Sequence, residues 1–217
     1  MRLSRLLIAL SAGAIVVTPA PKPGKAGTAG VEIRWFFRGD LPADVRHWFT
    51  QNGSARGPFS ETDEDKRHDV YLVVQGDKEV GLKLRGNELE LKQLRDTLDV
   101  RFSGGRISGR AEVWAKWEWS VTPREVAKKH PKGVQREVGK KRLQRTFEAG
   151  GAGCVAEITA LAVGDERWWT IAAGLPGSDP VTIKGCAEEV FRDYPGPALD
   201  GEHSLSYPAW LDSLGTN

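Results

Sequence analysis

Residues 80–92 alternate polar and apolar side chains on both sides of a Gly-Asn turn, reading Val-Gly-Leu-Lys-Leu-Arg-Gly-Asn-Glu-Leu-Glu-Leu-Lys. Strict alternation predicts two β-strands joined as a hairpin, each with one apolar and one charged face. Two arrangements fit this pattern: a sheet whose charged side faces water, or a barrel whose charged side faces inward. The charged positions are Lys83 and Arg85 on the first strand and Glu88, Glu90 and Lys92 on the second.

The chain of 217 residues is long enough for one domain with a sizeable core. Four of its 31 basic residues and none of its 29 acidic residues lie within residues 1–30, so the remainder carries a net charge of −2. A general basic field is therefore absent, which argues against a nucleic-acid partner.

The first thirty residues differ from the rest in composition. Arg2 and Arg5 precede an apolar run at residues 6–17, and a stretch rich in Pro, Gly and Ala follows. This order resembles a secretory signal with a spacer, although Thr-Pro-Ala-Pro at residues 18–21 is a poor cleavage region. The alternative is a disordered leader of a cytoplasmic protein. The run is too short to predict a stable membrane span.

We therefore expect a leader at residues 1–30 and a single domain at residues 31–217. Cys154 and Cys186 show no metal-binding spacing and form no disulfide framework, which is compatible with a reducing compartment. The expected location is the cytoplasm, with export through the N-terminal segment as the alternative.

Beyond residue 30 the alternating pattern recurs, with a few amphipathic helical segments between the strands. We expect helices that start near Asp40, at residues 122–129 and at residues 180–193, and an aromatic tail at residues 206–211 that packs on the domain. Residues 94–106 fit a strand or an irregular link, and residues 135–147 form a basic segment that fits a solvated helix face or a source of phosphate ligands. Strands are expected at residues 31–37, 67–75, 80–85, 88–92, 108–120, 154–161 and 167–172.

Charged side chains recur on one face of at least five of these strands, whereas the opposite faces are rich in Leu, Val, Ile and Trp. Helices packed on the apolar faces would leave the charged faces inside. We therefore predict an α+β chain, mostly antiparallel β, that forms a closed or nearly closed tunnel-like β-barrel with a few flanking helices. A charged lumen is costly unless its charges pair or meet a ligand.

The order of these segments resembles the CYTH domain, the fold of the triphosphate tunnel metalloenzymes. The resemblance spans residues 31–172. It rests on an opening strand with Glu32 and Arg34, Arg-His-Asp-Val-Tyr-Leu at residues 67–72, the hairpin at residues 80–92, Lys-Lys-Arg at residues 140–142, and a late strand with Glu157.

The resemblance implies an eight-stranded tunnel in which basic side chains bind a triphosphate and acidic ones hold Mg²⁺ or Mn²⁺. Members of the family hydrolyse inorganic triphosphate, thiamine triphosphate or nucleoside triphosphates, or cyclise ATP. Arginine and lysine suit phosphate oxygens, and carboxylates suit hard divalent ions. By matching position, the phosphate ligands would be Arg34, Lys83, Arg85, Lys92 and Arg142, and the metal ligands Glu32, Glu90 and Glu157.

The opening motif departs from the family's Glu-x-Glu-x-Lys, because residues 31–36 read Val-Glu-Ile-Arg-Trp-Phe. In either alignment one acidic metal ligand is missing. Three functions therefore stay open: a metal-dependent triphosphate hydrolase, a non-catalytic module that binds polyphosphate or an organic phosphate, and an exported structural barrel whose charges pair with one another.

Overall fold

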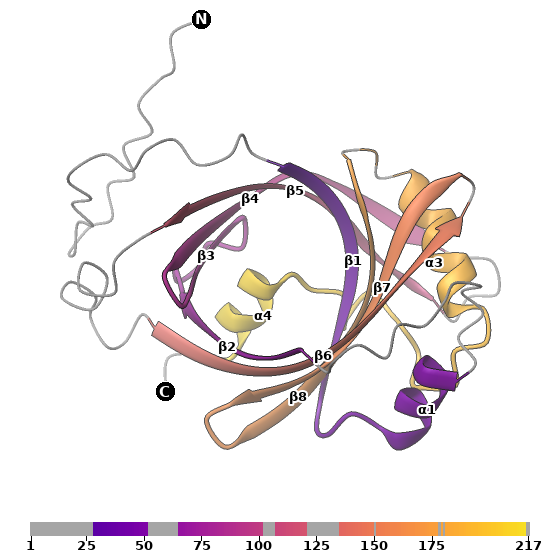
Figure 1. The fold of residues 1–217 in the computed structure, drawn as a ribbon, viewed down its shortest axis with the longest axis horizontal. Helices are drawn as coiled ribbons and strands as arrows, with labels where there is room; N and C mark the ends of the chain where they lie inside the picture. Colours follow the sequence, from indigo (N-terminus) through magenta and orange to yellow (C-terminus); the bar gives the residue numbers. More distant parts are fainter. Residues whose placement is uncertain are drawn as a thin grey trace, which may run out of the picture.

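The computed structural model describes residues 28–51, 65–101, 107–120, 135–149, 151–177, 179 and 181–215. Eight strands close into an antiparallel barrel in the order β1-β5-β4-β3-β2-β6-β7-β8 (Figure 1), which confirms the predicted fold class. The strands are β1 (Thr28–Arg38), β2 (Asp65–Leu72), β3 (Val80–Arg85), β4 (Glu88–Arg101), β5 (Ser108–Ser120), β6 (Gln135–Ala149), β7 (Ala152–Val163) and β8 (Glu166–Pro176), and the described helices are α1 (Ala43–Gln51), α3 (Thr182–Phe191) and α4 (Tyr207–Ser213).

The hairpin that dominates the sequence pattern is formed by β3 and β4. Gly86 and Asn87 connect the strands, and Gly86 has a φ of 55°, a conformation that glycine adopts without strain and that two-residue hairpin turns require. The register pairs Lys83 with Glu90, and their side chains point into the barrel because neighbouring residues alternate between its two sides. The water-facing alternative is therefore wrong for this hairpin.

The main hydrophobic core lies outside the barrel, between its wall and two helices. Ile33 and Trp35 of β1 point outward and are fully buried there with Ile158 of β7. Helix α1 contributes Val45, Trp48 and Phe49, and α3 contributes residues that include Phe191. Figure 1 shows both helices on the side of the barrel where β1 and β7 lie.

A second core closes one end of the barrel from within. Helix α4 lies inside the ring of strands in Figure 1 and buries Trp210 and Leu211 against Phe36 and Tyr71. Ser206 caps this helix by accepting a hydrogen bond from the Ala209 N–H at 3.2 Å. The expected aromatic tail therefore packs on the domain.

Several boundaries differ from the prediction. Strand β1 begins at Thr28, so three residues assigned to the leader lie in the barrel. Strand β2 ends at Leu72 rather than Gln75, and β4 continues to Arg101 through an irregularity between Leu94 and Asp96. The expected helix at residues 122–129 and residues 1–27 lie outside the described residues. Within the described part of the chain, no helix combines the length and hydropathy of a membrane span.

The basic segment at residues 135–147 is a strand, so the solvated-helix interpretation is wrong. It forms part of β6, which pairs with both β2 and β7. The alternation places Lys140 and Arg142 inside the barrel and Lys141 outside. A high density of lysine and arginine mimics a solvated helix, and only the period of two distinguishes the strand.

Candidate functional site

The barrel encloses a cavity of about 420 Å³ above the end that α4 closes. Every residue that the sequence predicted for the site lines it, from five different strands. These residues are Glu32, Arg34, Lys83, Arg85, Glu90, Lys92, Arg142 and Glu157.

The cross-strand register explains this convergence. Lys83 lies between Tyr71 of β2 and Glu90 of β4, and Glu90 lies beside Glu118 of β5. In the register of β4 and β5, Lys92 likewise lies directly opposite Lys116. Residues directly opposite each other on neighbouring strands point to the same side of the sheet. Charged positions of separate strands therefore meet in the lumen.

One group of ionic contacts centres on Asp69, which is fully buried. Its carboxylate accepts a hydrogen bond from Arg85 Nε at 2.7 Å and lies 3.1 Å from Lys140 Nζ and 4.0 Å from Lys83 Nζ. Burial alone would raise the pKa of Asp69, but the bond from Arg85 and the charges of Lys140 and Lys83 outweigh burial and hold this pKa well below its usual range. Asp69 is therefore an anion that orders three cations.

Glu90 extends this group toward β5. Its carboxylate lies 2.8 Å from Lys83 Nζ and 3.1 Å from Lys116 Nζ. Burial opposes ionisation of Glu90, but Lys83 and Lys92 lower its pKa to about 2. Burial also lowers the pKa of Lys83 to about 8, although Glu90 and Asp69 act in the opposite direction.

A second group centres on Arg34 of β1. Its guanidinium contacts Glu157 at 2.8 Å and Glu32 at 3.3 Å. Glu157 also accepts a hydrogen bond from Gln144 at 2.9 Å and lies 3.4 Å from Arg142. Burial works against the charged form of Glu157, but Arg34 and Arg142 dominate and lower the pKa of Glu157.

Aromatic side chains separate the two groups from the closed end. Lys140 Nζ donates to the Tyr71 hydroxyl at 2.7 Å and lies 3.7 Å from the centroid of the Tyr207 ring. Tyr71 and Tyr207 stack with their centroids 5.6 Å apart, and Arg34 lies 5.1 Å from the Tyr207 ring. Such contacts stabilise cations that have lost water. Burial nevertheless lowers the pKa of Lys140 well below its usual value, despite the opposing charge of Asp69.

The cavity wall carries an excess of positive charge. Three carboxylates, those of Glu32, Glu90 and Glu157, line it, and Asp69 lies behind it. Eight cationic side chains line it: Arg34, Arg67, Lys83, Arg85, Lys92, Lys116, Lys140 and Arg142.

Two lumen donors lack a protein acceptor among the residues that the structure describes. Lys92 of β4 forms no ion pair or hydrogen bond there, and its charge acts on Glu32 and Glu90 only at longer range. Arg34 Nε is buried without a hydrogen-bond acceptor. Buried donors in native proteins nearly always have partners, so the buried Arg34 Nε indicates a place for an acceptor that the described residues do not supply, in the cavity that the half-buried Lys92 also lines.

The carboxylates expected to hold Mg²⁺ or Mn²⁺ do not form a metal-binding set. Glu32 and Glu157 both bind Arg34, whereas Glu90 binds Lys83 and Lys116. Across the described ranges, no group of three or more acidic, histidine or cysteine side chains surrounds a position for an ion. A divalent ion needs several oxygen ligands at one point. This donor set therefore does not fit a resident metal.

A smaller cavity of about 240 Å³ adjoins the first and shares Lys92, Lys116 and Arg34 with it. Its walls also carry apolar surface from Trp114, Val155 and Ala172. The lumen therefore has a strongly cationic part beside a part with apolar surface.

Sequence reasoning missed several polar residues of the lumen, among them Asp69, Lys116, Lys140 and Tyr207. Three of them carried a usable signal, because each lies in alternation with a predicted site residue or with charged positions of its own strand. Tyr207 carried none, since the pattern of α4 does not reveal that the helix packs within the barrel.

Comparison with models of known protein families finds no match for this sequence, and no curated protein matches it either.

Proposed function

We propose that this barrel binds a small polyanion of the triphosphate type in its lumen. The observation that carries the proposal is the charge of the 420 Å³ cavity, where eight cationic side chains face three carboxylates. An enclosed, cationic cavity attracts anions more strongly than an open surface does, because water screens the charges less.

The kinds of side chain favour phosphate oxygens. Arginine can bind two oxygens at once, and lysine supplies a compact charge with three donors. Lys92 and Arg34 Nε have no acceptor within the described part of the chain, so an anion between them completes the hydrogen bonding of the site. A chain of linked phosphates matches cations that are distributed along a lumen rather than gathered at one point.

Membership of the CYTH superfamily is part of this proposal. It is supported by the closed eight-stranded antiparallel barrel and by a lumen that mixes basic and acidic residues. Hydrolysis in that family depends on a divalent ion, and the separation of Glu90 from Glu32 and Glu157 argues for binding without hydrolysis. The requirement for Mg²⁺ or Mn²⁺ stays a prediction, which a hydrolysis assay decides.

An organic phosphate is the second candidate ligand. The specific observation in its favour is the adjoining 240 Å³ cavity, in which Trp114, Val155 and Ala172 offer apolar surface and Lys92 a charge. Ligand sites commonly combine such surface with a few placed charges. An organic group in this cavity would leave its phosphates within the cationic part.

Titration calorimetry with tripolyphosphate tests the proposal, with EDTA present to exclude metal ions. Lys92→Met should weaken binding by about 2 kcal/mol, roughly thirtyfold, because a charge-assisted hydrogen bond is lost. The matched control is Lys141→Met, which removes an exposed lysine from the outer side of β6 and should leave the affinity unchanged.

Two further measurements separate the alternatives. Phosphate release from tripolyphosphate with Mg²⁺ or Mn²⁺ would favour the hydrolase over the binding module. Absence of any binding to tripolyphosphate, pyrophosphate or an aromatic phosphate ester, with or without metal, would overturn the proposal and leave a structural barrel.

A further inference from the structure

One part of the barrel's outer wall is apolar but belongs to neither hydrophobic core. The strand registers place its side chains in two rows, Leu82–Leu91–Trp117 and Leu84–Leu89–Trp119, across β3, β4 and β5. They point outward, because Lys83, Glu90 and Lys116, which are their direct neighbours along the three strands, point into the lumen. We call this surface the leucine–tryptophan face; its members are Leu82, Leu84, Leu89, Leu91, Trp117 and Trp119.

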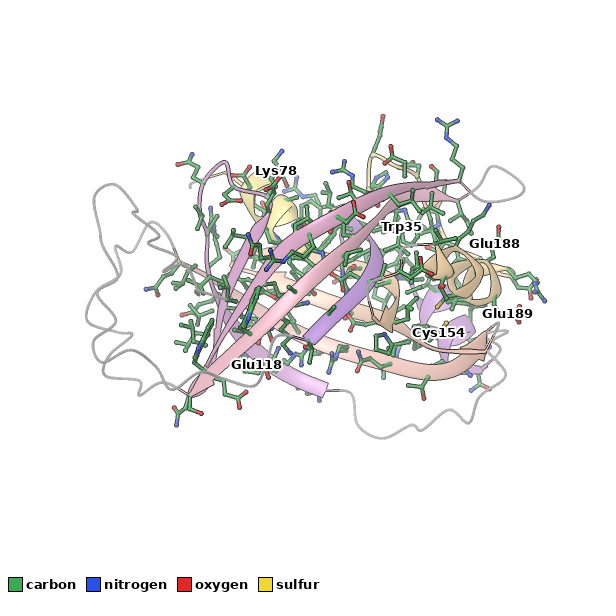
Figure 2. All side chains as sticks on the ribbon, turned by 90° about the horizontal axis from the view of Figure 1, so that it is seen from above. Trp35, Lys78, Glu118, Cys154, Glu188 and Glu189 are labelled. Carbon is green, nitrogen blue, oxygen red and sulfur yellow. The ribbon has the colours of Figure 1, made fainter. Side chains whose placement is uncertain are left out.

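The helices described in the structure do not cover this face. Helices α1 and α3 pack on the opposite part of the wall, and α4 lies inside the barrel (Figure 1). Figure 2 places Glu118, which lies between the two tryptophans, away from α3 and from the labelled Trp35 and Cys154 of the helix-covered wall. All six side chains of the face are only half-buried. Apolar surface on the outside of a fold can serve as a docking site.

We propose that the apolar N-terminal run, residues 6–17, is the segment that docks on the leucine–tryptophan face. The first described residue, Thr28, pairs with Lys116, the residue directly before Trp117. The chain therefore enters the barrel beside the tryptophan end of this face. Residues 18–27 separate the run from β1, and ten extended residues span up to about 33 Å, which exceeds the length of six-residue β3, about 20 Å.

Composition favours this run over the other parts of the chain outside the described residues. Residues 6–17 contain no charged side chain and seven of leucine, isoleucine or valine. Residues 121–134 carry five lysine, arginine or glutamate side chains, and residues 52–64 contain only one large apolar side chain, Phe59. Apolar surface on both partners provides the driving force for docking.

Thiol labelling in the full-length chain tests the contact. A Leu91→Cys variant presents a thiol on the face, whereas the native Cys154 and Cys186 are buried and serve as unreactive references. Adding Leu7→Asp and Leu10→Asp should raise the rate of maleimide labelling at position 91 by about tenfold, because the run no longer protects it. The matched control adds Thr18→Asp and Ala26→Asp in the spacer and should leave the rate unchanged.

A cross-link gives an independent result. With Leu10→Cys and Leu91→Cys in one chain, a mild thiol oxidant should form an intramolecular disulfide. The control pair, Leu10→Cys with Lys141→Cys on another part of the wall, should form none. Intact mass must show that residues 1–27 are present in the protein tested.

Four outcomes would overturn the proposal: a labelling rate that ignores the aspartates, protection that depends on protein concentration, protection that needs lipid vesicles, or removal of the run from the chain in the cell. The second and third would assign the face to another copy and to a membrane surface, respectively.

Discussion

Strand β1 separates two interiors that contribute to the protein in different ways. On its outer side, Ile33 and Trp35 lie fully buried among apolar side chains and helices. On its inner side, the buried Arg34 and the half-buried Glu32 lie among charges. Burial of apolar surface stabilises a fold directly, whereas burial of charge costs desolvation that ion pairs only offset. The outer core therefore supplies stability, and the lumen supplies binding chemistry.

Trp35→Ala tests the stabilising side of this comparison. Trp35 is fully buried, packs edge-on against Phe191 with centroids 5.4 Å apart, and donates from its indole nitrogen to the Ser108 carbonyl at 2.9 Å. The substitution should lower the free energy of unfolding by about 4 kcal/mol, measured by urea denaturation. Trp117→Ala removes the same atoms from a half-buried position and should cost about 1 kcal/mol; equal losses would contradict the assignment of the two surfaces.

Arg34→Met tests the lumen. It removes the partner that Glu32 and Glu157 share, so the buried Glu157 and the half-buried Glu32 lose their shortest ionic contacts. Breaking a buried pair in this way should cost about 3 kcal/mol of unfolding free energy. The double variant Arg34→Met/Glu157→Gln should recover part of the loss, because one of the stranded charges is gone. If the double variant is less stable than Arg34→Met, the pair does not couple as described.

The alternating pattern predicted the strands of this fold well, because a period of two is a local property. Lys83 and Arg85 with Glu88 and Glu90 defined the hairpin, and the apolar positions of β1 indicated that helices would cover its outer side. Closure of the barrel made the inward direction consistent across strands, so all predicted site residues share one cavity. The site residues were predicted from the order of the segments, which resembles that of the CYTH domain, rather than from any single motif.

Pairing in the lumen was not predictable, since it depends on registers between strands distant in sequence. Glu90 looked like a metal ligand by position, but the register places it beside Lys83 and Lys116. Asp69 looked like one charge in a strand and instead contacts three cations. The position of α4 inside the ring was equally hidden, because packing against Phe36 and Tyr71 decides it.

Glu112 links the lumen to the dependence of stability on pH. Burial, followed by the charge of Glu32 across the strand pair, raises the pKa of Glu112 to about 7. Because this exceeds the usual glutamate pKa of about 4.5, the folded state holds the proton more tightly, and the associated stability is lost as pH rises from about 4.5 to about 7. The change in unfolding free energy caused by Glu112→Gln should therefore be about 2 kcal/mol more favourable at pH 8 than at pH 5.

Urea denaturation of both proteins at the two pH values measures this effect. Glutamine keeps an oxygen that can accept the bond from Trp114 Nε1, which is 3.1 Å from Glu112 in the native protein. If the native protein and Glu112→Gln differ in unfolding free energy by the same amount at pH 5 and at pH 8, the pKa of Glu112 is not raised in the folded state.

The smallest expected effect concerns the pH dependence of anion binding, which again separates the lumen from the outer core. Burial lowers the pKa of Lys83 to about 8, and an anion binds its protonated form. The affinity for tripolyphosphate should therefore be highest below pH 8 and should fall above pH 8, by up to about tenfold per pH unit. Lys83→Arg keeps the charge at every pH and should flatten the calorimetric profile between pH 7 and pH 9, whereas Lys141→Arg on the outer side should not. A wild-type affinity that stays constant across this range would place the bound anion away from Lys83, nearer to Lys92 and Arg34.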